Sequence, residues 1–307
     1  MPWKNGCSMG SFPGVEPMLE EIASQPECWR RAGELSRSEG DGALPKRGER
    51  VAFAGCGSSW HMAQCAAVFR EMAGQGAGDA FPASEPVAGR GYDLLVVISR
   101  TGTTTEVLRL LDSWHGASRS LAVTATRGSP LATSSGSAVV VDFADEVGVV
   151  QTRSATTALA LLLASAGCDL EPAIASARRA LDRGLPGDLH GARRHVFLAT
   201  GWAVGLAEEA ALKLRESAGA WAEAYPAMEY RHGPASALPE ESLVWEIGVL
   251  PAGVREFAAS TGSTVVGSCG EPMGDLVLVQ RAAVELAVAA GRDPAWPPHL
   301  GRSVILG

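Results

Sequence analysis

Short continuous apolar runs alternate with amphipathic stretches through the first half of the chain. Each apolar run has the length of a buried strand, and each amphipathic stretch has the spacing of a helix with one apolar face. Continuous apolar strands that alternate with helices predict a parallel sheet covered on both faces. The predicted strands are 50–55, 92–99, 120–126 and 137–143, and the predicted helices are 61–74 and 105–116.

The same pattern restarts in the second half. A helix rich in Ala and Leu at 154–166 closes the first half, and a helix followed by a linker is predicted within 168–193. A strand, a glycine turn and a helix then follow in the order already seen at the start of the chain, which predicts two related α/β halves. The predicted elements are strands at 195–200, 242–248, 263–268 and 275–280 and a helix at 206–221.

Length, charge and hydropathy exclude several classes of protein. A chain of 307 residues predicts about two domains. A net charge of −8 argues against a nucleic-acid partner, because phosphate backbones are bound by dense basic surfaces. The longest apolar run, 158–166, is too short to cross a membrane, and the N-terminus lacks the features of a secretory signal. We therefore expect a cytoplasmic protein with no membrane partner.

The cysteines indicate neither a disulfide framework nor a metal site. Six cysteines are scattered along the chain without a CxxC pair or the spacing of zinc ligands. The nearest pair of possible ligands, His61 and Cys65, lies one turn apart on a predicted helix, and two ligands do not make a zinc site. No metal and no cofactor are expected.

A loop rich in hydroxyl groups follows the predicted strand 92–99. In open parallel sheets, ligands bind where a strand ends and a helix begins, and free N–H groups of the first helical turn favour an anion there. Gly102 allows the backbone to approach a ligand closely. The alternative is a simple capping turn with Thr104 or Thr105 as the cap, but a cap needs only one hydroxyl. The loop has five, at Ser99, Thr101, Thr103, Thr104 and Thr105, and predicts a phosphate site.

A second small-residue turn, "GCGSS" at 55–59, offers Ser58 and Ser59 after the first predicted strand. It lacks the last glycine of the dinucleotide fingerprint, and no acidic residue ends a strand about twenty residues later. The chain also has no GxxxxGK[ST] motif. Dinucleotide binding is therefore weakly indicated and nucleoside triphosphate hydrolysis is not expected.

The predicted helix around 204–216 combines an apolar surface with three charges. Glu209, Lys213 and Glu216 fall at i, i+4 and i+7, on one face. On an exposed helix these charges would form an ordinary ion-pair ladder. On a buried helix they need partners or a cleft, and a carboxylate there can act as a general base. The stretch alone leaves both interpretations open.

A histidine follows in the segment "EYRHGP" at 229–234. A single histidine such as His232 is more often structural than catalytic. Together with a carboxylate helix and a phosphate loop, however, it completes a set for carbonyl chemistry on a sugar phosphate. The phosphate would be anchored, His232 would assist ring opening, and a glutamate would move a proton between adjacent carbons.

These stretches together resemble the sugar isomerase (SIS) domain family. They are similar in particular to the tandem isomerase half of the glutamine–fructose-6-phosphate aminotransferases and to stand-alone amino-sugar-phosphate deaminases. The resemblance spans most of the chain and depends on seven segments in order: "EEIASQP", "GCGSSWHMA", "ISRTGTTTEV", "EVGVVQTRSATT", "EEAALKLRE", "EAYPAMEYRHGP" and "HLGRSV".

The resemblance implies an α/β fold of two SIS domains. Each would be a mostly parallel sheet with helices on both faces, a flavodoxin-like three-layer sandwich. The expected organisation is an N-terminal helical segment at 1–35, a first SIS domain at 36–170, and a second SIS domain with a C-terminal tail at 171–307.

The family also implies roles for individual residues. Glu216 matches the glutamate that moves the C1–C2 proton, Lys213 its neighbouring lysine, and His232 the ring-opening histidine. That histidine typically reaches the active site of a neighbouring subunit, so a homodimer is implied. The expected ligands of the sugar phosphate are Ser58, Ser59, Ser99, Arg100, Thr101, Gly102, Thr104, Gln151 and Thr152, with Arg100 where the aminotransferases commonly have Gln.

Two departures from the aminotransferases limit the expected chemistry. Their glutaminase domain begins with a cysteine after the initiator Met, whereas this chain has Pro2 and about fifty residues before the first predicted strand. No glutaminase activity is therefore expected. Their tail lysine forms a Schiff base with the ketose, whereas "HLGRSV" places Arg302 there, and a guanidinium is a poor imine former.

The sequence therefore predicts an enzyme that deaminates and isomerises an amino-sugar phosphate to a ketose phosphate and ammonia. One alternative is an aldose–ketose isomerase that uses the same glutamate and histidine without releasing ammonia. A further alternative is a non-catalytic sugar-phosphate sensor, because SIS domains also serve as ligand-binding modules.

Overall fold

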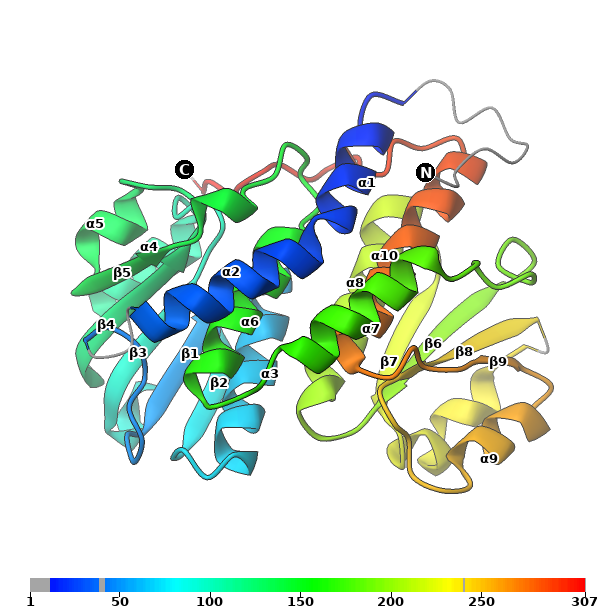
Figure 1. The fold of residues 1–307 in the computed structure, drawn as a ribbon, viewed down its shortest axis with the longest axis horizontal. Helices are drawn as coiled ribbons and strands as arrows, with labels where there is room; N and C mark the ends of the chain where they lie inside the picture. Colours follow the sequence, from blue (N-terminus) through cyan, green and yellow to red (C-terminus); the bar gives the residue numbers. More distant parts are fainter. Residues whose placement is uncertain (1–11, 39–41, 240, 307) are drawn as a thin grey trace.

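The computed structural model describes residues 12–38, 42–239 and 241–306. Two parallel sheets stand on either side of a central layer of helices (Figure 1). The first sheet comes from the first half of the chain and the second from the second half. The structure is therefore α/β with parallel sheets flanked by helices, as the alternation of apolar and amphipathic stretches predicted.

The first sheet has five parallel strands in the order β2-β1-β3-β4-β5. This is the flavodoxin-like order, in which the direction of winding reverses between β1 and β3. Four of its strands lie within or overlap the predicted ranges, whereas the short edge strand β2 was not predicted. The bounds are β1 Val51–Gly55, β2 Gly78–Pro82, β3 Tyr92–Ile98, β4 Ala117–Thr124 and β5 Ser137–Val140.

The second sheet repeats the first four positions of that order, as β7-β6-β8-β9, again with all strands parallel. Its edge strand β7 is only partly buried along much of its length, so its sequence lacks the continuous apolar run that marks β6 and β8. The bounds are β6 Arg194–Ala199, β7 Ala222–Pro226, β8 Ser242–Ile247 and β9 Thr264–Val266.

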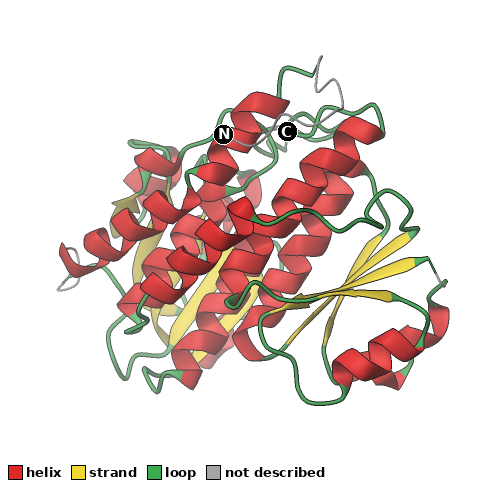
Figure 2. Cartoon of the chain, turned by 45° about the vertical axis from the view of Figure 1, so that its right-hand side comes forward, coloured by secondary structure: helices red, strands yellow, loops and turns green. Residues whose placement is uncertain are grey.

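Helices cover both faces of each sheet (Figure 2). α3 and α6 pack between the sheets against the first, and α8 and α10 against the second. α4 and α5 cover the outer face of the first sheet, and α9 that of the second. The bounds are α3 Ser58–Met72, α4 Thr105–Ser113, α5 Pro130–Ser134, α6 Arg153–Ser165, α7 Glu171–Asp182, α8 Val204–Lys213, α9 Val254–Ser260 and α10 Pro272–Ala289.

Two N-terminal helices, α1 (Val15–Ala23) and α2 (Gln25–Ser38), lie along the central layer. A buried polar chain ties them to it: Gln25 donates to Gln280 on α10 (2.6 Å) and accepts from Thr156 on α6 (2.8 Å). The predicted helical segment 1–35 is helical from Val15, and residues 1–11 lie outside the described residues.

Two sequence predictions were wrong in the second half. The run 275–280, expected as a strand, lies in helix α10. That helix is buried around most of its circumference, so its apolar residues form an unbroken run rather than a stripe. The predicted helix 206–221 is α-helical only to Lys213, where a π-helical turn, η4 (Leu214–Ala218), follows.

Short 3-10 turns complete the chain: η1 Ala88–Arg90, η2 Asp142–Ala144, η3 Gly201–Ala203, η5 Glu229–His232 and η6 Pro234–Ala237. None of the helices in the described ranges is long and apolar enough to cross a membrane.

The two halves meet where α3 crosses α8, and Gly205 makes that approach possible. A Cβ at this position would lie 2.6 Å from the Cys65 sulfur and 2.7 Å from the His61 carbonyl oxygen. We expect Gly205→Ala to lower the free energy of unfolding by about 1–3 kcal/mol through overpacking, measured by chemical denaturation. Gly184→Ala is the control, because nothing lies within 4 Å of a Cβ there. Equal stability of the two variants would contradict this account of the crossing.

Candidate active site

A pocket lies at the carboxyl ends of β1 and β3, the point where the strand order of the first sheet reverses. This is where open α/β sheets bind ligands. Its lining comes from the turn after β1, the loop after β3, the segment before α6 and the C-terminal tail: Cys56, Ser59, Ile98, Ser99, Arg100, Thr101, Thr104, Val107, Gln151 and Arg302. Six of the predicted ligands therefore meet in one place.

The hydroxyl loop between β3 and α4 is held by its own side chains. The Ser99 hydroxyl accepts the Gly102 N–H (3.2 Å), and the Thr101 hydroxyl accepts both the N–H and the hydroxyl of Thr103. Gly102 has a φ of 63°, and a Cβ there would lie 2.2 Å from the Ser129 hydroxyl oxygen. Glycine fits this turn because of its positive φ and the closeness of Ser129.

The C-terminal tail lies against the start of α4. The Ser303 hydroxyl is 2.9 Å from the Thr103 hydroxyl and 3.3 Å from that of Thr104. The Thr105 N–H donates to the Val304 carbonyl oxygen (3.0 Å). Thr104 occupies the N-cap position, but its side chain makes no capping bond to the helix. The capping explanation for the hydroxyls therefore fails for the side chain of Thr104.

Arg100 lies beside the pocket with a side chain that is only 2% exposed. Its guanidinium donates to the carbonyl oxygens of Gly148 (2.8 Å) and Val149 (3.1 Å), and it lies 3.8 Å from the Glu146 carboxylate. Burial lowers the pKa of Arg100, and Glu146 opposes that shift. The side chain is therefore bonded to the loop before α6.

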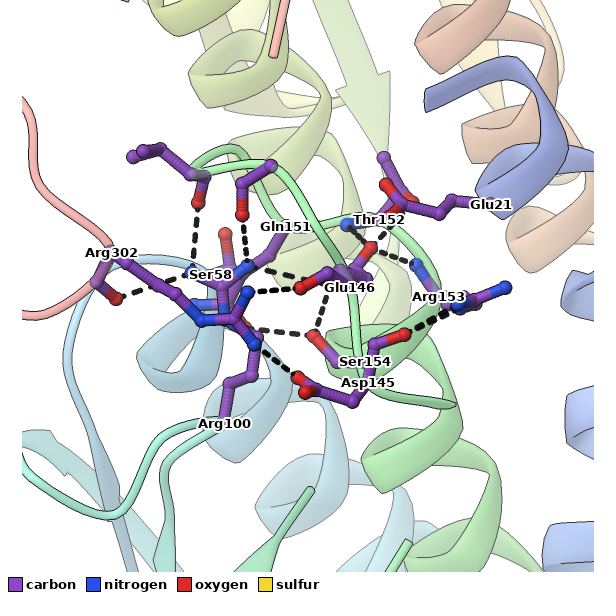
Figure 3. A network of polar contacts seen from close by, with 12 residues as sticks. Glu21, Ser58, Arg100, Asp145, Glu146, Gln151, Thr152, Arg153, Ser154 and Arg302 are labelled. Atoms are coloured by element: carbon purple, nitrogen blue, oxygen red, sulfur yellow. Dashed lines mark hydrogen bonds and ion pairs between the residues drawn. The ribbon is translucent and has the colours of Figure 1, made fainter. Parts of the chain in front are cut away.

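The Glu146 carboxylate organises that loop (Figure 3). It is fully buried and accepts the N–H (2.5 Å) and hydroxyl (2.6 Å) of Thr152, the Arg153 N–H (2.8 Å) and the Ser154 hydroxyl. These bonds fix the first turn of α6. Thr152 is turned toward Glu146, whereas Gln151 beside it lines the pocket. Of these two predicted ligands, the structure brings only Gln151 to the pocket surface.

Lys213 joins the carboxylate helix to the "GCGSS" turn. Its ammonium group is fully buried and lies 2.5 Å from Glu216, 3.3 Å from Glu209 and 3.0 Å from the Ser58 hydroxyl. Burial works against the charge, but the two carboxylates outweigh it and raise the pKa of Lys213. Lys213 is thus a charged group here, and the predicted shared face of the three residues is confirmed.

The two carboxylates of this cluster differ in environment. Glu209 is 1% exposed and burial raises its pKa, against the lowering effect of Lys213. Glu216 is 19% exposed and stands in the π-helical turn η4. Insertions of π-helix are frequent at functional sites. This turn brings Glu216 to Lys213 across three residues.

His232 does not join this cluster within the chain. It ends the turn η5 and is exposed, and among the described residues no hydrogen bond or ion pair links it to Lys213 or Glu216. Sequence reasoning also missed two groups that shape the site, Glu146 and Ser303. Ser303 bonds to predicted ligands only because distant segments meet, whereas Glu146 bonds to Thr152 within the same loop. Both residues stand in segments that carry the family resemblance, but nothing in their spacing shows these bonds.

The described residues contain no group of three or more His, Cys, Asp or Glu side chains that could hold a metal ion. His61 and Cys65 are both buried, and the His61 ring bonds to Gln64 (3.1 Å).

Comparisons with known proteins identify what this chain is similar to. Glutamine–fructose-6-phosphate aminotransferase of Thermus thermophilus is 27% identical over 360 aligned positions that cover 96% of this chain and 59% of that protein, so the chain spans less than two thirds of this relative. Glucosamine-6-phosphate deaminase from Thermotoga maritima superposes with a TM-score of 0.76 at 27% identity, covering 94% of this chain and all of that one.

A third comparison concerns the fold alone. Tagatose-6-phosphate ketose/aldose isomerase from Escherichia coli has a TM-score of 0.75 at 20% identity and covers 99% of this chain and 98% of that one. No family model matches the chain. The likeness to the aminotransferase and to the deaminase confirms the resemblance to the sugar isomerase (SIS) domain family.

The buried Glu21 on α1 makes stability depend on pH. One carboxylate oxygen accepts the Val147 N–H (2.6 Å) and the other has no hydrogen-bond partner. Burial and the nearby Glu146 raise the pKa of Glu21 from 4.5 to about 7. A raised pKa means that the protonated form is preferred in the folded state. The stability that Glu21 contributes is complete below pH 4.5 and is lost as pH rises through 7.

We therefore expect Glu21→Gln to gain stability over the natural chain as pH rises from 5 to 8, by up to about 3 kcal/mol. Urea denaturation at a series of pH values measures the effect. Glu20→Gln, at the adjacent exposed position, is the control. A difference between Glu21→Gln and the natural chain that does not change with pH would contradict the shifted carboxyl.

Proposed function

We propose that this protein deaminates and isomerises an amino-sugar phosphate, releasing a ketose phosphate and ammonia. The observation that carries the proposal is the bond between Lys213 and Ser58. It places the Glu216–Lys213 pair beside the turn whose next residue, Ser59, lines the hydroxyl pocket. The proposed proton-transfer pair would therefore bond to Ser58, and the proposed anion site would begin at Ser59, the next residue of the same turn.

In this proposal, phosphate binding and proton transfer are carried out by different residues. Ser59, Ser99, Thr101 and Thr104 offer hydroxyl groups to the phosphate at the carboxyl end of β3. Glu216 would take the proton from C2 of the open-chain amino aldehyde and return it to C1, while a proton passes from the C2 amine to the C1 oxygen. This leaves a hydroxyl group at C1 and an imine at C2. Water then adds to C2, and ammonia leaves as the C2 carbonyl forms. Lys213 would hold Glu216 in place.

The family resemblance supports further proposals about organisation. We propose that the two sheets belong to two SIS domains, at 36–170 and 171–307, and that the protein works as a cytoplasmic homodimer. The exposed position of His232 supports the dimer, because a ring-opening group must reach a substrate. On a two-fold axis His232 of each subunit would serve the pocket of the other.

Glucosamine 6-phosphate is the first substrate to test. We expect it to yield ammonia and a ketose phosphate in equal amounts, and Glu216→Gln to lower kcat by about 10²–10⁴-fold, the usual contribution of a general base. An enzymatic ammonia assay beside a ketose assay measures both. Glu208→Gln, on the same helix but outside the Lys213 cluster, is the control.

The outcomes separate the candidate activities. Ketose formed from aldose phosphates, with no ammonia from any hexosamine phosphate, would show the isomerase that the same glutamate also supports. Full turnover by Glu216→Gln would contradict the assigned base. Binding without turnover in the natural chain would favour a sensor.

A mixing experiment tests the role of His232 across the dimer. We expect Glu216→Gln and His232→Asn each to be inactive, and their refolded mixture to regain about a quarter of the natural activity. Half of the dimers would then be mixed, each with one intact site built from both chains. A mixture that stays inactive although mixed dimers are shown to form would place His232 and Glu216 in the same subunit's site.

A further inference from the structure

We infer that Arg100 and Arg302 act together as a clamp that positions the loop before α6 and the C-terminal tail around the pocket. Both are positioning residues in this inference. The inference concerns the site of the proposed function, and only its kinetic test depends on that function. Arg100 and Arg302 stand at two of the positions where the sequence departs from the aminotransferase pattern, and the structure joins them.

The clamp acts on four successive carbonyl groups. The Arg302 guanidinium donates to the carbonyl oxygens of Glu146 and Val147, and the Arg100 guanidinium to those of Gly148 and Val149. No secondary structure in the described chain pairs this stretch, so its carbonyl oxygens need other donors. Two planar guanidinium groups, with five donors each, supply them.

The two arginines are also linked to each other and to acidic groups. Arg100 donates to the Arg302 carbonyl oxygen (3.2 Å), which ties the tail to the loop after β3. Arg302 pairs with the Asp145 carboxylate at 2.6 Å, and Arg100 lies 3.8 Å from Glu146. A tail residue, a loop residue and the 145–149 segment thus form one connected unit.

The clamp positions two side chains at the pocket, those of Gln151 and Ser303. Gln151 follows the clamped carbonyls by two residues and lines the pocket. Ser303 follows Arg302 directly and bonds to the hydroxyls of Thr103 and Thr104. Freeing the clamp would therefore loosen both the sugar-facing side and the tail-facing side of the site.

The direction of the Arg302 side chain has a chemical consequence. Its guanidinium is bound to Asp145 and to loop carbonyls. Position 302 therefore presents no free amine to a ketose, and the attack at C2 falls to water, as the proposed deamination requires. A lysine at this position, with three donors on one nitrogen, could not reproduce the planar pattern of bonds.

Hydrogen–deuterium exchange tests the clamp without any assumption about activity. In Arg302→Met and in Arg100→Met we expect faster exchange of the peptides that contain Val149 and Thr105. The amides of these residues bond to the Ala295 and Val304 carbonyls, respectively. Arg127→Met is the matched control, because Arg127 forms an exposed ion pair with Asp142 outside the clamp.

Arg302 is partly exposed, so Arg302→Met is expected to fold. The test can therefore be carried out on this variant even if removal of the buried Arg100 prevents folding. Unchanged exchange of both peptides in a folded Arg302→Met protein would overturn the clamp, whatever reaction the protein catalyses.

Kinetics with glucosamine 6-phosphate test the positioning role. We expect Arg302→Met to raise KM about tenfold and to leave kcat within about twofold, because binding groups are loosened while Glu216 is untouched. Arg302→Lys should restore part of the loss through Asp145. A fall in kcat with an unchanged KM would overturn the positioning role, whereas absence of turnover in the natural chain would overturn the proposed function and leave the exchange test in force.

A trapping experiment tests the direction of position 302. Arg302→Lys is incubated with fructose 6-phosphate and borohydride, and its tail peptide is analysed by mass spectrometry. We expect no adduct at position 302, because the new ammonium would pair with Asp145. A reduced adduct there would show that a side chain at position 302 reaches the ketose carbon and would overturn the inference that this position points away from the substrate.

Discussion

The charged, fully buried Lys213 is the constraint on which the site depends. Removing an ammonium group from water costs several kcal/mol, and only close partners offset that cost. Its partners come from both halves of the chain: Glu209 and Glu216 follow β6, and Ser58 follows β1. The requirement to satisfy one cation therefore fixes α8 against α3, and with them the position of one sheet relative to the other.

The same constraint separates the two carboxylates chemically. Burial raises the pKa of Glu209, Lys213 opposes that shift, and the nearby Glu216 adds to it. The more accessible Glu216 stands at the turn where the α-helix widens. A group that exchanges protons with a substrate must meet the substrate, so accessibility selects Glu216 over Glu209 for that task.

The sequence predicted the fold well for elements that can be recognised from their own run of residues. Continuous apolar runs predicted β1, β3, β4, β6 and β8, and the hydroxyl loop predicted Ser99, Thr101 and Thr104, which line the pocket. It failed where burial is complete on every side. Residues 275–280 of helix α10 were predicted as a strand. The helix is buried on nearly all sides, so its apolar residues do not show the 3.6-residue spacing that identifies a helix.

The missing parts of the site have a similar physical origin. Glu146 stands in a motif, but nothing in its spacing shows that its carboxylate caps α6 while its carbonyl binds the tail. Arg100 was predicted as a ligand and lines the pocket, but its bonds to loop carbonyls about fifty residues away in sequence were not predicted. Such bonds depend on loops that tertiary packing brings together, and one-dimensional patterns do not encode them.

The pocket is thus assembled from segments that are far apart in the chain: the turns after β1 and β3, the loop before α6, the helix after β6 and the tail. Each segment supplies hydrogen-bond donors or acceptors to polar groups of another segment. Ser303 meets the loop hydroxyls, two guanidinium groups meet four carbonyls, and Ser58 meets Lys213. Buried polar groups that lose their hydrogen-bond partners raise the free energy of the folded state. Displacement of one segment would leave polar groups of its neighbours in that condition. The geometry of the first sheet's pocket therefore depends on the second half and on the last residues of the chain, and neither can be removed without changing it.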